Sequence, residues 1–346
     1  MNRRQFLTVT GAALTVLPVA LPAADAPVKP KIRVGLLGAT YSHAADKLKF
    51  ILASPDWDLV GVWEESDAGR ETCRKLGARS VSQAEVLERS EVVFVESDIR
   101  DHAKHAWLAL RAGRHVHVEK PPATTLAEMR ELVTLAREKK RLLQTGYMWR
   151  HHPGFGAILE ATRRGWFGDI FMVRAHIANN LAIARRPNWA EFPGGGMFEQ
   201  GSHLVDVIVR LLGRPKKVTP FTRHHGAFAD KLNDNNVAVL EFDRALAVLT
   251  NSTMQSATMP ARSFEVLGSN GSAVLQPIEP PALQFEFTKA AGPYAAGVQT
   301  VPSKYQRYEG DFAELAAAVR GEHALGVDLD TELLVQETLL RVSNMM

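Results

Sequence analysis

Three side chains have the types and spacing needed to move a proton while an alcohol is oxidised. Lys120 follows a short β-rich run at 115–118, and Glu199 and His203 are four residues apart, a spacing that places both on one face of a helix. Transfer of hydride from a carbinol requires a base within hydrogen-bond reach of the hydroxyl. We therefore expect Lys120 and His203 to be catalytic proton carriers, while Glu199 fixes the histidine tautomer or binds a substrate hydroxyl.

Each of these side chains also has a purely structural explanation. Most lysines are surface residues. The segment 197–212 has the pattern of an amphipathic helix, with Glu199 and His203 on its polar face and Leu204 and Ile208 on its apolar face. The glycine run just before this segment favours a functional site, because a close-approach turn suits a cleft that holds a substrate.

The turn at 38–43 is the place where a dinucleotide pyrophosphate would bind, because the first expected strand ends there and a helix begins. Gly38 supplies the first glycine of the G-x-G-x-x-G pattern, whereas Thr40 and His43 occupy the other two places. A Cβ atom at position 40 obstructs close approach of a phosphate, although the hydroxyls of Thr40 and Ser42 offer hydrogen bonds instead. An ordinary strand-to-helix turn explains the same residues.

An acidic residue ends the second expected strand. Glu64 could accept hydrogen bonds from the adenosine ribose hydroxyls, which favours NAD over NADP. Arg70 is near enough in the sequence to keep NADP possible. The alternative is a solvated carboxylate with no ligand.

The elements that would position these side chains change in character near residue 150. Up to that point β-rich runs alternate with helical stretches, which predicts βαβ units and a parallel sheet. The expected strands are 32–37, 58–63, 91–95 and 115–118. Beyond it, strands follow one another without long helices, which favours an antiparallel sheet. Those strands are 171–177, 237–242, 245–249, 263–267 and 283–287.

Several strings occur in order along the chain. They are Ala112-Gly113-Arg114-His115-Val116 with Glu119-Lys120-Pro121, then Gly146-Tyr147-Met148-Trp149-Arg150, then the run from Gly194 to His203. Together they resemble the Gfo/Idh/MocA family of glucose-fructose oxidoreductase and inositol dehydrogenase. The resemblance implies an α/β protein with a Rossmann dinucleotide-binding domain at 31–150, followed by an α+β domain at 151–346 with an open, mostly antiparallel sheet.

The resemblance also implies roles for particular residues. In that family the lysine of the Glu-Lys-Pro motif lies beside the nicotinamide and the substrate, which points to Lys120. A histidine preceded four positions earlier by an aspartate completes the usual site; here these are His203 and, with glutamate in place of aspartate, Glu199. The expected cofactor is NAD, with NADP possible. The expected cofactor contacts are Gly38, Thr40, Tyr41, Ser42, His43, Glu64, Ser97, Glu119 and Lys120.

Four further side chains are candidates for lining a sugar site. Aromatic faces pack on the C–H faces of sugars, and a cation can hold a hydroxyl or carboxylate. These candidates are Tyr147, Arg150, His152 and Trp189. We predict no metal, because the 12 histidines show no ligand spacing such as His-Glu-x-x-His and Cys73 is the only cysteine.

Composition and the N-terminal residues indicate which partners and which cellular location to expect. The 346 residues carry a formal net charge of +3 with no basic run, which gives no support for nucleic-acid binding. Residues 1–26 contain Arg3-Arg4 before an interrupted apolar stretch and resemble a twin-arginine export signal. We expect a periplasmic or otherwise exported protein with no stable membrane span after cleavage.

The function expected from the sequence is an NAD(P)-dependent oxidoreductase acting on a sugar, cyclitol or related polyol. Because the periplasm offers little free nicotinamide cofactor, we expect the cofactor to be held tightly. One alternative is a redox-neutral NAD-dependent glycosidase or epimerase. Another is a sugar-binding or scaffold protein that has lost cofactor turnover. A homo-oligomer is expected from the resemblance only.

Overall fold

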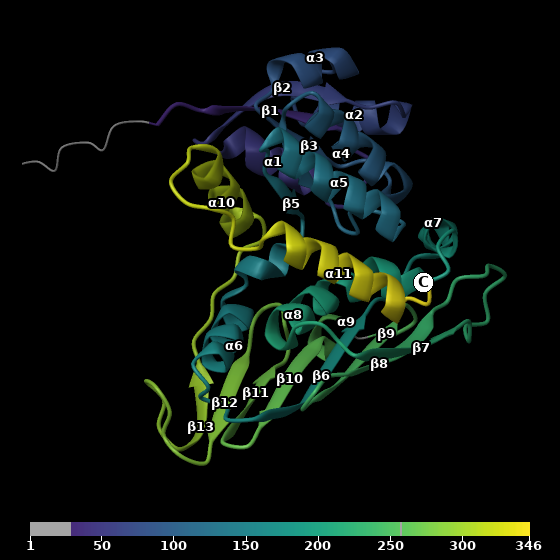
Figure 1. Ribbon diagram of the computed structural model, residues 1–346. Coiled ribbons are helices and arrows are strands. Elements are labelled where there is room, and N and C mark those ends of the chain that lie inside the picture. The colour runs from purple at the N-terminus through teal and green to yellow at the C-terminus, as the bar shows by residue number, and fades with distance from the viewer. Residues whose placement is uncertain (1–28, 257) are drawn as a thin grey trace, which may run out of the picture. The chain divides into compact units, whose positions relative to one another are not determined.

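A parallel sheet covered by helices forms the first part of the protein (Figure 1). The computed structural model describes residues 29–256 and 258–346, so the predicted export signal at 1–26 lies outside the described residues. The strand order is β2-β1-β3-β4-β5, and every pairing is parallel. The strands are β1 (Ile32–Leu37), β2 (Trp57–Trp63), β3 (Val92–Val95), β4 (His115–Val118) and β5 (Leu143–Thr145). The predicted Rossmann-type architecture is confirmed.

Local sequence signals explain several of the helices around this sheet. These helices are α1 (Ala44–Ala53), α2 (Asp67–Lys75), α3 (Gln83–Arg89), α4 (His102–Arg111) and α5 (Leu126–Lys139). The predicted capping box is present at the start of α5: the Thr125 hydroxyl accepts from the Glu128 amide, and the Glu128 carboxylate accepts from the Thr125 amide. All four residues of β3 are buried, because helices cover both faces of a parallel sheet.

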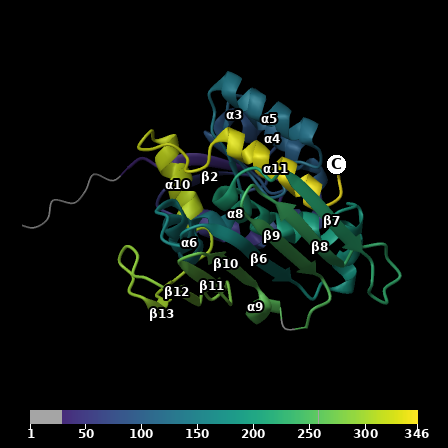
Figure 2. The same cartoon turned by 60° about the horizontal axis from the view of Figure 1, so that its bottom comes forward.

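An eight-stranded sheet forms the second part (Figure 2). Its mostly antiparallel character is as predicted, whereas its strands β7, β11 and β13 were not expected from the sequence. The strand order is β13-β12-β11-β10-β6-β9-β8-β7, and only the β6–β9 pairing is parallel. The strands are β6 (Ile170–Ala178), β7 (Lys217–Arg223), β8 (Asn235–Glu241), β9 (Leu246–Ser252), β10 (Ser263–Gly268), β11 (Gly271–Leu275), β12 (Leu283–Phe287) and β13 (Gly297–Val301).

The remaining helices follow β5 in the chain. They are α6 (Pro153–Arg163), α7 (Arg186–Ala190), α8 (Ser202–Leu212), α9 (Thr258–Ala261), α10 (Glu309–Val319) and α11 (Leu329–Val342), with short 3₁₀ turns at Ile99–Asp101, Met148–His151 and Ile183–Arg185. Helix α11 packs against both α5 and α8. Phe312 of α10 makes edge-to-face contacts with Trp57 and Phe94 of the first part. The C-terminal helices therefore fix the two sheets together through buried apolar contacts.

The predicted helix at 197–212 is present, but its first turn differs from the expectation. Met197–Gly201 forms a π-helical turn, and regular α-helix begins only at Ser202. Glu199 and His203 therefore lie on either side of a change in helical pitch, so the simple four-residue spacing rule does not apply between them. None of the helices in the described ranges is long and apolar enough to cross a membrane.

Candidate active site

Lys120 lies just beyond the carboxyl end of β4, the edge of a parallel sheet where ligands bind. Its side chain is only 2% exposed. The ammonium donates to Glu199 twice, to the carboxylate Oε1 at 2.6 Å and to the main-chain oxygen at 3.0 Å. The structure thus joins the Glu-Lys-Pro lysine of the first part to the π-helical turn of the second.

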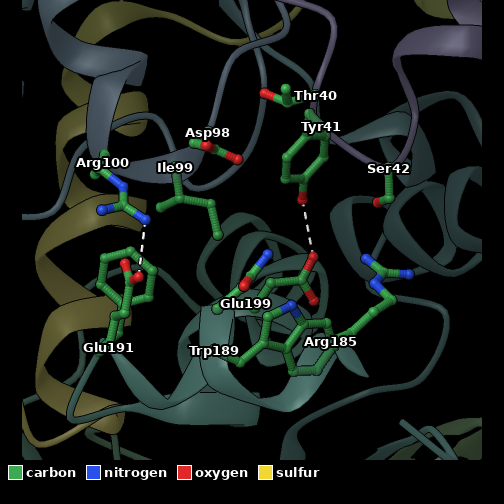
Figure 3. Close-up of a pocket in the computed structure, with 12 residues that line it drawn as sticks. Thr40, Tyr41, Ser42, Asp98, Ile99, Arg100, Arg185, Trp189, Glu191 and Glu199 are labelled. Carbon is green, nitrogen blue, oxygen red and sulfur yellow. Dashed lines mark hydrogen bonds and ion pairs between the residues drawn. The ribbon is translucent and has the colours of Figure 1, made fainter. Parts of the chain in front are cut away.

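Tyr41 completes this contact from the β1–α1 turn. Its hydroxyl donates to Glu199 Oε1 at 2.8 Å, and the Lys120 ammonium lies 5.4 Å from the centre of its ring. Figure 3 shows the Tyr41 and Glu199 side chains pointing toward one another from opposite sides of a pocket. Burial opposes ionisation of Glu199, but Lys120 and the Tyr41 hydrogen bond outweigh it and hold the pKa of this carboxyl below its ordinary value.

His203 has a different environment from the one the sequence suggested. Neither ring nitrogen has a hydrogen-bond partner in the described part of the chain, and Nδ1 is fully buried. The ring instead packs 4.9 Å from that of Trp149, so Glu199 does not fix its tautomer. Burial, together with the positive charge of Lys120, lowers the pKa of His203 well below its ordinary value. The imidazole is therefore neutral at pH 7, with a ring nitrogen free to bind a ligand.

A cavity of about 280 Å³ adjoins these side chains, and we call it the main cavity. Its lining includes His43, Lys120, Trp149, Trp189, Glu199, His203 and three arginines, Arg185, Arg262 and Arg307. A second space, the loop pocket, lies beside the β1–α1 turn (Figure 3). Thr40, Tyr41, Ser42, Asp98, Trp189 and Glu199 are among the residues that line it. Tyr41, Trp189 and Glu199 therefore lie close to the place where a cofactor on the turn would meet a substrate.

The β1–α1 turn retains features of a dinucleotide cradle despite its missing glycines. Gly38 has a φ of +82°, and a Cβ atom there would lie 2.4 Å from Ser97 Cα, so only glycine fits. Thr40 and Ser42 are exposed and lie just before the ten-residue helix α1. Their backbone N–H groups donate no hydrogen bond to another described residue. Free amides at a helix N-terminus bind phosphate oxygens. The turn therefore fits a pyrophosphate.

Glu64 and Ser97 both pack against this turn. The Glu64 carboxylate accepts from the amides of Ala39 at 2.5 Å and Ser66 at 2.7 Å, and it is buried. These bonds tie the turn to the end of β2. Both oxygens of the Glu64 carboxylate already have backbone partners. The contact of Glu64 with the ribose stays a prediction. The Ser97 hydroxyl bonds to His105 at 2.9 Å, beneath Gly38.

A buried charge network that the sequence analysis missed lies behind Glu119. Lys47 is 1% exposed, and its ammonium lies 2.5 Å from Glu119 Oε1, 2.9 Å from Glu96 Oε1 and 2.8 Å from His117 Nε2. His43 Nδ1 lies 3.1 Å from the same Glu119 oxygen. The available signal was a lysine inside the apolar stripe of α1, where Ala44, Leu48 and Ile51 are also buried.

The network determines which carboxyls carry charge. Burial opposes ionisation of Glu119, yet Lys47 and His43 hold its pKa well below the ordinary value. For Glu96, burial raises the pKa more than the charge of Lys47 lowers it, and the pKa is about 8. Glu119 Oε2 accepts from the Lys120 amide at 3.0 Å, so the ionised carboxylate positions the backbone of the lysine.

Three of the four predicted sugar-lining residues have structural partners instead. Arg150 pairs with Asp206 at 2.7 Å and Glu332 at 2.6 Å. His152 accepts from the backbone at the start of α6 and lies 2.8 Å from the Ile278 carbonyl, so it caps that helix. Tyr147 is buried and its ring lies against the Arg150 guanidinium. Trp189 lines both cavities. No group of three or more metal-binding side chains occurs among the residues that the structure describes.

Comparison with known proteins identifies the two parts. Residues 32–147 match the model of an oxidoreductase family with an NAD-binding Rossmann fold, GFO_IDH_MocA, and residues 155–274 match the C-terminal domain of the same family. D-glucoside 3-dehydrogenase of Escherichia coli is 30% identical over 53% of this chain and 55% of its own length. Trans-1,2-dihydrobenzene-1,2-diol dehydrogenase of Bos taurus is 28% identical over 58% of this chain and 65% of its own length. The chain therefore spans between half and two thirds of these relatives.

Solved structures share the whole architecture. UDP-N-acetylglucosamine 3-dehydrogenase from Acidithiobacillus ferrooxidans has a TM-score of 0.77 at 18% identity, covering 92% of this chain and 98% of its own. The WlbA dehydrogenase from Chromobacterium violaceum, solved with NADH and UDP-GlcNAcA, has a TM-score of 0.73 at 18% identity, covering 94% and 96%. Such likeness shows the fold, and the two family models supply the rest: residues 32–147 are an NAD(P)-binding Rossmann domain, and the chain belongs to the Gfo/Idh/MocA oxidoreductase family.

Proposed function

We propose that this protein is an NAD(P)-dependent oxidoreductase that oxidises a CH–OH group of a sugar, cyclitol or related polyol. The observation that carries the proposal is that Lys120, Glu199 and His203 line one cavity beside the β1–α1 turn, and that the His203 ring has no hydrogen-bond partner among the described residues. The names of relatives support it, because D-glucoside 3-dehydrogenase and a diol dehydrogenase both act on hydroxyl-bearing carbons.

The residues of the chain supply the acid–base chemistry. A substrate hydroxyl in the main cavity donates to the free nitrogen of neutral His203, which accepts the proton as the carbon is oxidised. The Lys120 ammonium, held in place by Glu199, stabilises the negative charge that develops on the substrate oxygen. The nicotinamide of a bound NAD(P) supplies the hydride acceptor, and the free amides of Thr40 and Ser42 would hold its pyrophosphate.

The orientation of Lys120 depends on two carboxylates. Glu199 binds its ammonium, and Glu119 binds its amide. Because each carboxylate is buried and ionised, moving the lysine would leave a buried charge without a partner, which is costly. The lysine is therefore held in one position before any substrate arrives.

The cofactor is tested first. The purified protein is denatured, and any released dinucleotide is identified by mass spectrometry. If none co-purifies and calorimetry detects no binding of added NAD or NADP, the proposal fails. Localisation outside the cytoplasm and self-association remain predictions, tested by cell fractionation and light scattering.

The chemistry is tested next with a panel of sugars and polyols. We expect an absorbance change at the reduced-nicotinamide band, and a loss of about 100-fold or more in turnover for Lys120→Ala with bound cofactor retained. The exposed lysine Lys49 provides the matched control, Lys49→Ala. Normal turnover by Lys120→Ala would refute the assignment of this lysine. A product formed without net cofactor reduction would indicate the redox-neutral alternative.

A further inference from the structure

The main cavity has an excess of positive charge. Four of its lining side chains are cationic, namely Lys120, Arg185, Arg262 and Arg307, whereas Glu199 is the one carboxylate described among them. Both Lys120 and Tyr41 already donate to that carboxylate. A neutral sugar needs no such excess, because its hydroxyls are recognised by neutral and charged groups alike.

Arg262, the residue just before β10, has no acidic salt-bridge partner among the residues that the structure describes. Its Nε and Nη2 both donate to the carbonyl oxygen of Ala178, at 3.2 and 3.1 Å. No salt bridge reaches it within the described residues, although the side chain is half-buried. Burial and the nearby charge of Arg307 lower the pKa of its guanidinium, while Glu279 opposes this. An arginine in this condition is stabilised by an anion that enters the cavity.

Arg307 is held in an orientation that leaves donors free. Its Nε donates to Glu279 Oε2 at 2.6 Å, and Glu279 Oε1 accepts from the indole of Trp149 at 2.6 Å. Neither Nη1 nor Nη2 of Arg307 has a hydrogen bond to another described residue. Because Trp149 also packs on His203, this arginine is fixed relative to the base. An anionic group bound here would hold the rest of the ligand against His203.

We propose that the substrate is an acidic sugar, and that Arg262 and Arg307 bind its anionic group while a ring hydroxyl meets His203 and Lys120. This rests on the proposed function for the claim that the bound sugar is oxidised. The shared chemistry is a carboxylate or a phosphate on a sugar ring, since guanidinium groups bind both. The exposed Arg185 at the rim adds attraction during entry rather than a fixed contact.

Calorimetry with three probes tests the proposal without turnover. We expect D-glucuronate or D-glucose 6-phosphate to bind the purified protein at least about tenfold more tightly than D-glucose, as expected for one charge-assisted hydrogen bond. The tighter of the two anions identifies the charged group. Anion affinity should fall as salt is raised from 50 to 300 mM, whereas glucose affinity should not. Equal affinity for glucose and both anions, or no anion binding, would overturn the proposal.

Variants locate the site. Arg262→Gln and Arg307→Gln should each weaken anion binding about tenfold or more and leave glucose binding unchanged, whereas Arg262→Lys should restore part of the loss because it keeps the charge. The control Arg164→Gln removes an exposed arginine that follows the last residue of α6 and pairs with Glu160. Far-ultraviolet circular dichroism confirms that each variant is folded. If both cavity variants bind anions like the wild type, the two arginines do not form the site.

The same samples separate this inference from the proposed function. If anions bind through these arginines but no sugar reduces the cofactor, the anion site stands and the redox function fails. If neutral polyols reduce the cofactor and acidic sugars neither bind nor react, the redox function stands and the acidic-sugar inference fails.

Discussion

Replacing Lys47 with methionine tests whether the buried network stabilises the fold beside Lys120, at the carboxyl edge of the parallel sheet. Lys47→Met keeps most of the side-chain volume and removes the only described cation that contacts both Glu96 and Glu119. Breaking a buried ion pair by removing one partner costs about 3–5 kcal/mol, because the remaining charge stays buried without compensation. We expect a loss of that size at pH 8. Lys49→Met, on the same helix but exposed, should change stability by about 0.5 kcal/mol or less.

The loss should shrink as the pH falls. In the wild type the pKa of Glu119 lies well below its ordinary value, so this carboxyl stabilises the fold above that ordinary value and loses its contribution only in strong acid. Without Lys47, burial raises the pKa of Glu119, so the folded variant takes up a proton and its stability declines as the pH rises. The difference between wild type and variant is therefore larger at pH 8 than at pH 5.

Urea denaturation at both pH values, followed by tryptophan fluorescence and circular dichroism, measures this difference. Coincidence of the two signals checks that one transition is being followed. A cost below about 1 kcal/mol at pH 8, or an equal cost at pH 5 and pH 8, would show that Lys47 does not neutralise the buried carboxylates. Adding Glu119→Gln to Lys47→Met should recover part of the loss, because the uncompensated charge is then absent.

Three further predictions concern the turn and the base. Gly38→Ala should destabilise the fold in urea denaturation by about 1–3 kcal/mol more than Gly77→Ala. Both glycines have a φ of +82°, but only a Cβ atom at position 38 would clash with Ser97. Equal losses would assign the effect to backbone strain alone. Tyr41→Phe should move the acid limb of the turnover profile to higher pH, since the pKa of Glu199 rises when it loses a hydrogen bond; an unchanged limb would exclude Glu199 as the group titrating there. His203→Asn should lower turnover about 100-fold without releasing the dinucleotide, measured by reduced-nicotinamide absorbance and mass spectrometry; retained turnover would remove His203 as the base.

Local patterns in the sequence predicted most of the strands and the change in sheet type near residue 150, but not the strands β5, β7, β11 and β13. Alternation of β-rich and helical stretches predicted the parallel sheet, and the capping box at Thr125 and Glu128 predicted where α5 begins. Lys120 was placed correctly at the carboxyl end of a strand. These features depend on residues close together in the chain, whose hydrogen bonds and periodicity act over a few positions.

The partners of the buried charges depended on the tertiary structure. The four-residue spacing predicted that Glu199 would face His203. In the structure Glu199 lies in a π-helical turn, and its carboxylate binds the ammonium of Lys120, 79 positions away. Arg150 likewise pairs with Glu332, 182 positions away.

The sequence by itself determined the fold class, the lysine at the end of β4 and the position of the turn between β1 and α1. Only the tertiary structure decided that Lys47 is buried among carboxylates and that Arg262 and Arg307 line one cavity. The physical reason is that the energy of a charge depends on its burial and on the charges around it, and both are set by packing between distant segments.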